Sequence, residues 1–222
     1  MTYSIANLKR EIRIALDQNM NSTPLLILGD IDTLSMDDII ESKIEDAARV
    51  VTRDAARHLL DGGVSFGESV AWYVREGYGS GYILLPNDFL RLVSFQMSDW
   101  SYPVTVAISE DDPMYPLQHS RFGGVRGNPQ KPVVALSQQP ITVDGEKKAG
   151  LVLEFFSCAS GEGTFVKRAT YIPIPKISEG EITIGEKLKP AVIYYAAYLV
   201  ALSIGEGDLA VAMLNTSKEL MQ

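Results

Sequence analysis

The residues of this sequence that could carry out chemistry are few and far apart. The chain of 222 residues has two histidines, His58 and His119, and one cysteine, Cys158. A Ser–His–Asp or Cys–His site would have to bring such residues together across the fold, and no Gly-x-Ser-x-Gly elbow supports one. His58 lies at the end of a predicted helix, where a histidine that caps the helix is the more ordinary interpretation. We therefore predict no catalytic residue and no enzymatic activity.

A calcium loop is the metal site that the spacing of carboxylates suggests first. Its ligand positions 1, 3, 9 and 12 would be Asp30, Asp32, Asp38 and Glu41. Position 5 would then be Leu34, which has no side-chain oxygen, and position 6, which calls for glycine, would be Ser35. One cysteine and two distant histidines give no zinc ligand set, and the glycine-rich string 160–164 lacks the Gly-Lys-Ser/Thr of a phosphate-binding loop. We predict no metal site and no cofactor.

The charge pattern indicates a surface for a partner rather than a reaction site. The formal net charge is −8, yet no Asp or Glu occurs between Pro113 and Val143, where His119, Arg121, Arg126 and Lys131 fall in a Gly/Pro-rich loop. A solvated loop that happens to be basic is one interpretation. The other is an arm that reaches an acidic surface, either nucleic acid or a neighbouring copy in head-to-tail association. On the second interpretation the candidate contact residues are Arg121, Arg126 and Lys131, with Asp37 and Asp38 on the acidic side.

Aromatic residues concentrate between positions 72 and 102, although they form only 9% of the chain. The first expectation is that they build the core where the β part meets the helices. The second is that some stay exposed as anchors for subunit contacts, because aromatic residues are enriched at interfaces. Trp100 and Tyr102 are the candidates for that role.

Helices are predicted at both ends of the chain. Apolar residues at spacings of three and four indicate helices over 4–16 and about 36–60, the second beginning at the capping signal Ser35-x-x-Asp38. Two more are expected at about 189–202, with Pro190 in the first helical position, and at about 208–221.

The middle of the chain reads as short strands separated by turns. Val93, Phe95 and Met97 alternate with polar residues, and Val104, Val106 and Ile108 repeat the pattern. Further strand-like runs cover 132–137, 150–157 and 164–172. We predict an α+β fold in which the N- and C-terminal helices form a bundle, residues 1–78 together with 176–222. An antiparallel β module, a small sandwich or barrel, is inserted at 79–175.

Membrane insertion and secretion are not indicated. The first 23 residues have no apolar core of a signal peptide. The longest apolar run, 191–202, is shorter than the roughly 20 residues that cross a bilayer.

The order of parts resembles the head-to-tail connector (adaptor or neck-ring) proteins of tailed bacteriophages, including short-tailed and crAss-like phages. Three features carry this resemblance. The first is an N-terminal pair of helices. The second is Trp72 followed by Leu85-Pro86-x-Asp88-Phe89-Leu90-Arg91-Leu92 at the entry to the β module. The third is a C-terminal helix with the sequence Leu188-Lys-Pro-Ala-Val-Ile-Tyr-Tyr-Ala-Ala-Tyr-Leu, which is followed by Gly-Glu-Gly-Asp.

The resemblance implies a structural virion protein that is assembled in the host bacterial cytoplasm. Such proteins form a homo-oligomeric ring, commonly of twelve copies, between the capsid portal and the tail. The expected partners are the portal protein and a downstream tail or second ring protein. DNA would pass through the channel without sequence-specific binding, and an acidic wall suits that passage because it repels phosphate.

Two other classes of function stay open from the residues. One is a carbohydrate- or protein-binding β module on a helical stalk, in a surface or fibre-associated protein, which would be a monomer or trimer with affinity for a ligand. The other is a carboxylate-dependent hydrolase, which needs two carboxylates that converge in a pocket. No pair in the sequence stands out for that role.

Overall fold

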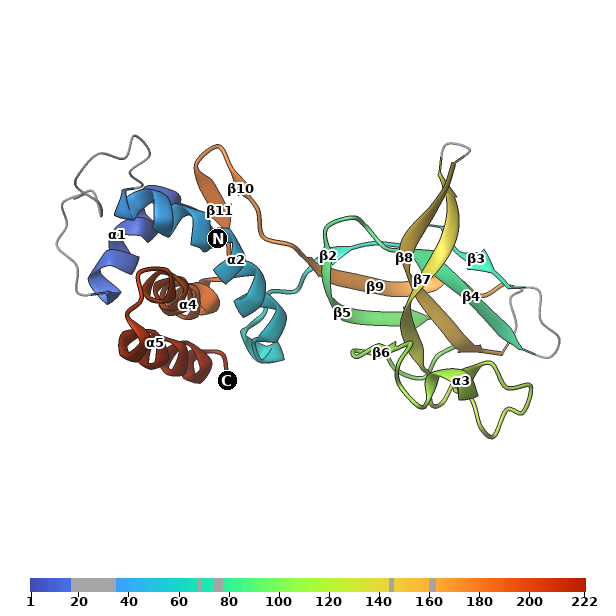
Figure 1. The fold of residues 1–222 in the computed structure, drawn as a ribbon. Helices are drawn as coiled ribbons and strands as arrows, with labels where there is room; N and C mark the ends of the chain where they lie inside the picture. The colour runs from blue at the N-terminus through green and yellow to red at the C-terminus, as the bar shows by residue number, and fades with distance from the viewer. Residues whose placement is uncertain (17–34, 68, 74–77, 144–145, 160–162) are drawn as a thin grey trace. The chain divides into compact units, whose positions relative to one another are not determined.

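The chain folds into two compact units, one made from both ends and one made from the middle (Figure 1). The computed structural model describes residues 1–16, 35–67, 69–73, 78–143, 146–159 and 163–222, with the backbone alone for 141–143 and 146–148. The terminal unit comprises Met1–Asp61 and Ile174–Gln222, and the central unit comprises Gly62–Pro173. The described residues contain five α-helices and three sheets, in agreement with the α+β prediction.

The unit boundaries differ from the predicted ones at the N-terminal side. The sequence pattern assigned residues up to 78 to the helices, but the structure divides the chain after Asp61. Val64–Ser65 (β2) and Ala71–Trp72 (β3) pair with strands of the central unit. These strands are two residues long, so they carry no period-two pattern that could have identified them.

Helices of the terminal unit follow the predicted pattern closely. They are α1 (Ile5–Ala15), α2 (Met36–Asp54), α4 (Lys189–Ser203) and α5 (Gly207–Leu220). Pro190 lies in the first turn of α4, at the second helical position instead of the predicted first, where its missing N–H has no partner to lose. Ser35 and Asp38 form the predicted capping box at the start of α2.

The second helix is shorter than predicted. It ends at Asp54 instead of Leu60, because Ala55 takes an extended conformation with φ −60° and ψ 150°. The amide of Ala56 then donates to the carbonyl of Met221 at 2.7 Å. Since this bond joins positions far apart in sequence, no local signal indicated where the helix would end. A short 3-10 turn, Arg57–Leu59, follows and contains His58.

The helix α4 lies at the centre of the terminal unit and packs against α1, α2 and α5. Its small residues Ala191, Ala196, Ala197 and Ala201 are completely buried. They allow the neighbouring helices to approach closely, which explains why the helix is apolar on nearly all sides.

A small sheet completes the terminal unit and was not predicted. Its strand order is β1 (Thr2–Ser4), β11 (Glu181–Thr183) and β10 (Ile177–Ser178), with antiparallel pairing. The sheet brings the N-terminal residues beside the segment that precedes α4.

The central unit contains two sheets. The first has the order β2, β9 (Val166–Pro173), β5 (Phe89–Met97). The second has the order β3, β4 (Gly79–Leu84), β8 (Glu146–Cys158), β7 (Val134–Val143), β6 (Ile108–Ser109). Pairing is antiparallel except between β6 and β7, which run parallel and thereby depart from the predicted all-antiparallel module.

The two sheets share one hydrophobic core. Phe95 of β5 and Phe155 of β8 stack with ring centroids 6.1 Å apart, and Ile83 and Leu153 are buried beside them. Most of the aromatic residues between positions 72 and 102 therefore serve the core of the central unit. The predicted strand over Val104, Val106 and Ile108 forms only in part: Val104 makes an isolated antiparallel bridge to Phe95 and Ile108–Ser109 pairs with β7, but Val106 between them is 76% exposed.

Candidate partner-contact surface

The segment 113–131, here called the basic loop, connects β6 to β7 and contains the short helix α3 (Tyr115–Gln118). It includes all three cations that the sequence nominated for partner contact. Its structure therefore decides whether those cations serve the fold or face outward.

Buried amide contacts close the basic loop onto itself. The side chain of Gln118 is fully buried. Its Nε2 donates to the carbonyl of Met114 at 3.0 Å, and its Oε1 accepts from the amide of Gly127 at 2.8 Å. A Cβ at Gly127 would lie 2.3 Å from the Oγ of Ser157, so only glycine fits against β8 at this point. These contacts fix the path of the loop.

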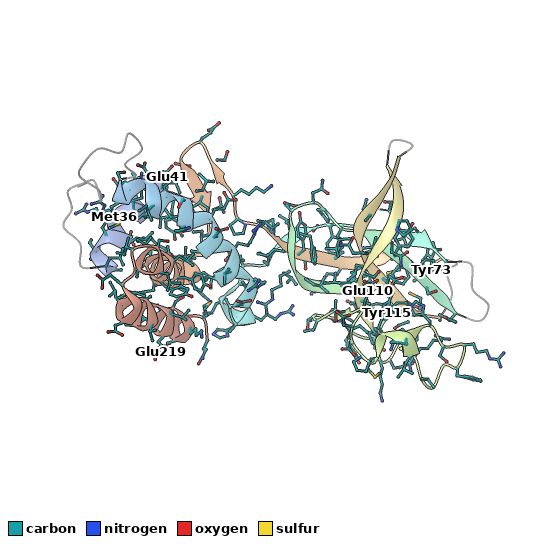
Figure 2. All side chains as sticks on the ribbon, viewed as in Figure 1. Met36, Glu41, Tyr73, Glu110, Tyr115 and Glu219 are labelled. Atoms are coloured by element: carbon teal, nitrogen blue, oxygen red, sulfur yellow. The ribbon has the colours of Figure 1, made fainter. Side chains whose placement is uncertain are left out.

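A buried carboxylate holds α3 on the second sheet. Glu154 of β8 is 1% exposed and accepts hydrogen bonds from the hydroxyls of Tyr73 and Tyr115 at 2.6 and 2.7 Å and from the Nε2 of Gln139 at 2.7 Å. Burial, and next the bond to Glu154, raise the pKa of the Tyr115 hydroxyl. Figure 2 labels the two tyrosines, which reach Glu154 from separate segments of the chain. Sequence patterns did not reveal this cluster, because its members are distant in the chain.

Arg126 lies half-buried at the base of the loop. Its guanidinium carbon is 3.4 Å from the centre of the Tyr78 ring. Its Nη1 has only long contacts, 3.5 Å each, to the carbonyls of Gly127 and Phe156, and its buried Nε meets no acceptor among the described residues. Burial lowers the pKa of Arg126. The side chain is thus held in place as a cation that no described carboxylate neutralises.

The other cationic candidates differ in what their side chains contact. Arg121 and Lys131 are exposed, and Arg121 lies over the ring of Phe122 at 5.1 Å. His119 instead packs edge-on against the rings of Tyr115 and Phe156, at 5.0 and 5.1 Å. It belongs with the aromatic contacts that attach α3 to the sheet.

A cavity of about 440 Å³ opens in this loop. Its walls include Met114, Gln118, Val125, Arg126 and Lys131, and no acidic residue is found among its described lining residues. The lining is apolar as well as cationic, since Met114 and Val125 within it are 47% and 44% exposed, and Phe122 of the same loop is 63% exposed. The basic loop therefore presents cations beside exposed apolar side chains.

Two predicted contact residues on α2 have partners inside the chain. The Oδ1 of Asp37 accepts from the Nε of the buried Arg13 at 2.8 Å. The Oδ2 of Asp38 accepts from the hydroxyl and the amide of Ser35 at 2.6 and 3.0 Å. Figure 2 labels Glu41, further along the same helix, which pairs with Lys9 at 2.7 Å. Asp30 and Asp32 of the rejected calcium loop lie outside the described residues.

The two aromatic candidates have different environments. Trp100 is 3% exposed and packs edge-on against Phe95 at 5.5 Å, so the prediction that it anchors a partner is corrected: it is a core residue. Tyr102 is exposed, as a contact residue must be.

A second basic groove, of about 700 Å³, runs along β9 and was missed by sequence reasoning. Phe66, Val70, Phe165, Lys167 and Arg168 are among its lining residues. Lys167 and Arg168 fall within the strand-like run 164–172, where nothing in their spacing marks a binding site. The sequence pattern therefore did not distinguish this groove.

Searches for a metal cluster and a membrane span were negative within the described ranges. No three His, Cys, Asp or Glu residues lie together there in a way that could hold a metal ion. None of the helices described has the length and apolar character needed to cross a membrane.

No protein-family model matches this chain. No curated protein matches it either.

Proposed function

We propose that this protein is a structural component of a tailed-bacteriophage neck, which forms a homo-oligomeric ring between the capsid portal and the tail and surrounds the DNA channel. The observation that carries the proposal is the exposure of apolar side chains on both units. In the terminal unit Leu202 of α4 and Val211 of α5 are 51% and 60% exposed. In the central unit the exposed apolar residues include Val106, Met114 and Phe122, in and before the basic loop. Such surfaces suit contacts between subunits.

The division of the chain fits the roles that the resemblance implies. The terminal unit, a bundle of helices built from both chain ends, would form the wall of the ring. The central unit, the inserted β module, would carry the basic loop to a neighbouring copy, to the portal or to the next tail component. α5 supports this role for the helices, because it packs mainly on α4 and only Ala210 and Ser217 within it are buried.

The net charge supports a role as a conduit for DNA rather than as a DNA-binding protein. At −8 the chain repels phosphate overall, so DNA would slide past a wall of such subunits. On this proposal the protein has no catalytic function and resides in the virion, after assembly in the bacterial cytoplasm.

A protein- or carbohydrate-binding β module is the second candidate, and the groove along β9 favours it. Exposed Phe165 at that groove could stack on a ligand, while Lys167 and Arg168 could contact its polar groups. This candidate predicts a monomer or trimer that binds a soluble ligand. The neck proposal predicts a large closed oligomer.

Electron microscopy of negatively stained protein separates the two candidates. The full chain would be imaged alone and after mixing with the portal protein encoded in the same genome. The neck proposal predicts closed rings, either free or seated on the portal. Single particles with no ring in both samples would contradict it, and a search of the neighbouring genes for a portal and a large terminase gives an independent check.

A further inference from the structure

Two cations and no described carboxylate line the cavity of the basic loop. Arg126 is held there by the Tyr78 ring, with a buried Nε that meets no acceptor and no carboxylate partner among the described residues. Lys131 lines the same cavity and forms no ion pair with any described residue. A half-buried guanidinium in fixed geometry favours a planar anion that can accept two hydrogen bonds, such as a carboxylate or a phosphate.

The surroundings of the cavity favour a carboxylate on a protein over a phosphate of nucleic acid. Met114 and Val125 form an apolar rim next to the two cations. A net charge of −8 also opposes the approach of a nucleic acid backbone. The complementary surface would therefore carry acidic and exposed apolar side chains together.

The turn between α4 and α5 has this composition. Glu206 and Asp208 are exposed, and no hydrogen bond or ion pair of their side chains is found among the described residues. Leu202 and Val211, on either side of them in sequence, are 51% and 60% exposed. The acidic start of α2 differs, because Asp37, Asp38 and Glu41 already have partners in their own chain.

We infer that the cavity of the basic loop binds a carboxylate from the α4–α5 turn of a second copy. This inference rests on the proposed homo-oligomeric ring and names the contact that joins its copies. The contact joins two different surfaces, so each copy offers one surface to one neighbour and the other surface to the next. Such heterologous contacts close into a ring when the rotation between copies allows it.

A charge-swap experiment on the full chain tests the inference. Arg126→Glu and Asp208→Arg should each weaken self-association, in solution or on the portal, by at least about tenfold, because each places like charges together. The variant with both changes should recover most of the loss. Lys131→Glu provides a second probe at an exposed position, where folding is not affected. Lys167→Glu, which alters the groove along β9 instead, is the matched control and should leave association unchanged.

Zero-length carbodiimide cross-linking identifies the contact directly. Equal amounts of ¹⁴N- and ¹⁵N-labelled chain would be mixed under the conditions that give oligomers, cross-linked and digested. The inference predicts mixed-isotope peptides that join Lys131 to Glu206 or Asp208, and their loss in Arg126→Glu.

Several outcomes would overturn the inference. Mixed-isotope links from Lys131 to Glu110 or Asp111 would show that two basic loops meet each other instead. Binding of a short DNA duplex that is lost in Arg126→Glu would assign the cavity to phosphate. If all the charge variants form rings normally, the inferred contact does not join the copies, although the proposed function still stands. If no oligomer forms even beside the portal, the proposed function itself fails.

Discussion

The start of α2 and the basic loop both concentrate charge of one sign, and the fold treats them differently. In α2 the carboxylates of Asp37, Asp38 and Glu41 each accept a hydrogen bond from within the chain. In the basic loop, Arg121, Arg126 and Lys131 form no ion pair with a described carboxylate. The charges at the start of α2 therefore contribute to the fold, whereas those of the basic loop are not paired with any described carboxylate.

The number of charges in a stretch does not by itself identify a contact surface. What distinguishes the two regions is whether each charge is already compensated. Because Arg126 has no carboxylate partner among the described residues, the loop that carries it is held by other groups, and Glu154 and Gln118 provide that support.

The largest effect is expected from Glu154→Ala, which removes the support of the basic loop. The change leaves the hydroxyls of Tyr73 and Tyr115 and the amide of Gln139 without their buried acceptor. We expect a loss of about 3–5 kcal/mol in the free energy of unfolding, measured by urea denaturation. Glu154→Gln, which keeps an acceptor oxygen, is the control and should lose clearly less. Equal stability of Glu154→Ala and wild type would show that the loop is held by other contacts.

Removal of a cation should lower the free energy of unfolding much more in the terminal unit than in the basic loop. Arg13→Ala deletes a side chain that is 5% exposed and pairs with Asp37, at an expected cost of about 2–3 kcal/mol. Arg126→Ala should cost less than about 1 kcal/mol, because no described carboxylate is left behind unpaired. Thermal and urea unfolding of both variants would measure the difference. Similar losses in the two variants would contradict the distinction between compensated and available charge.

Removal of the capping box at the start of α2 should cause a smaller loss of stability. Ser35→Ala removes the hydroxyl that accepts from the amide of Asp38 at 3.2 Å, and the expected loss is about 1 kcal/mol of unfolding free energy. Ser35→Asp, which restores an N-cap acceptor, should recover part of it. Unchanged stability in Ser35→Ala would mean that the first turn of α2 is held by tertiary contacts alone.

The smallest effect is a dependence of stability on pH that arises from Asp38. Its hydrogen bonds with the side chain and backbone of Ser35 lower the pKa of Asp38 in the folded state. A lowered folded pKa stabilises the protein above the unfolded pKa of about 3.9, and this contribution is lost as pH falls through the folded pKa. The unfolding free energy of wild type should therefore fall more steeply in acid than that of Asp38→Asn. Parallel curves for the two proteins would exclude the contribution.

Local patterns predicted much of the fold. The capping signal at Ser35 and the spacing of apolar residues located α2, and Pro190 marked the start of α4. The alternation at Val93, Phe95 and Met97 identified β5. These features depend on neighbours within a few residues, so they can be read from sequence.

Contacts between distant residues could not be predicted in the same way. The small sheet of β1, β11 and β10 joins Thr2 to Thr183, and the end of α2 depends on Met221. The sequence identified the basic loop correctly as a cationic stretch, but it did not show that Trp100 is buried or that Asp37 already pairs with Arg13. Whether a charged side chain has a partner of opposite charge depends on the folded structure, so sequence patterns alone do not show it.

The proposed ring contact is tested by comparing the size of the oligomer formed by wild type with that formed by the Arg121→Glu/Arg126→Glu double variant. Light scattering on the full chain, alone and with the portal protein, would give the mass of each assembly. We predict a closed assembly of many copies for wild type and its loss in the double variant, while the fold of each copy is kept. An unchanged mass in the variant, or a wild-type chain that stays monomeric beside the portal, would contradict the account.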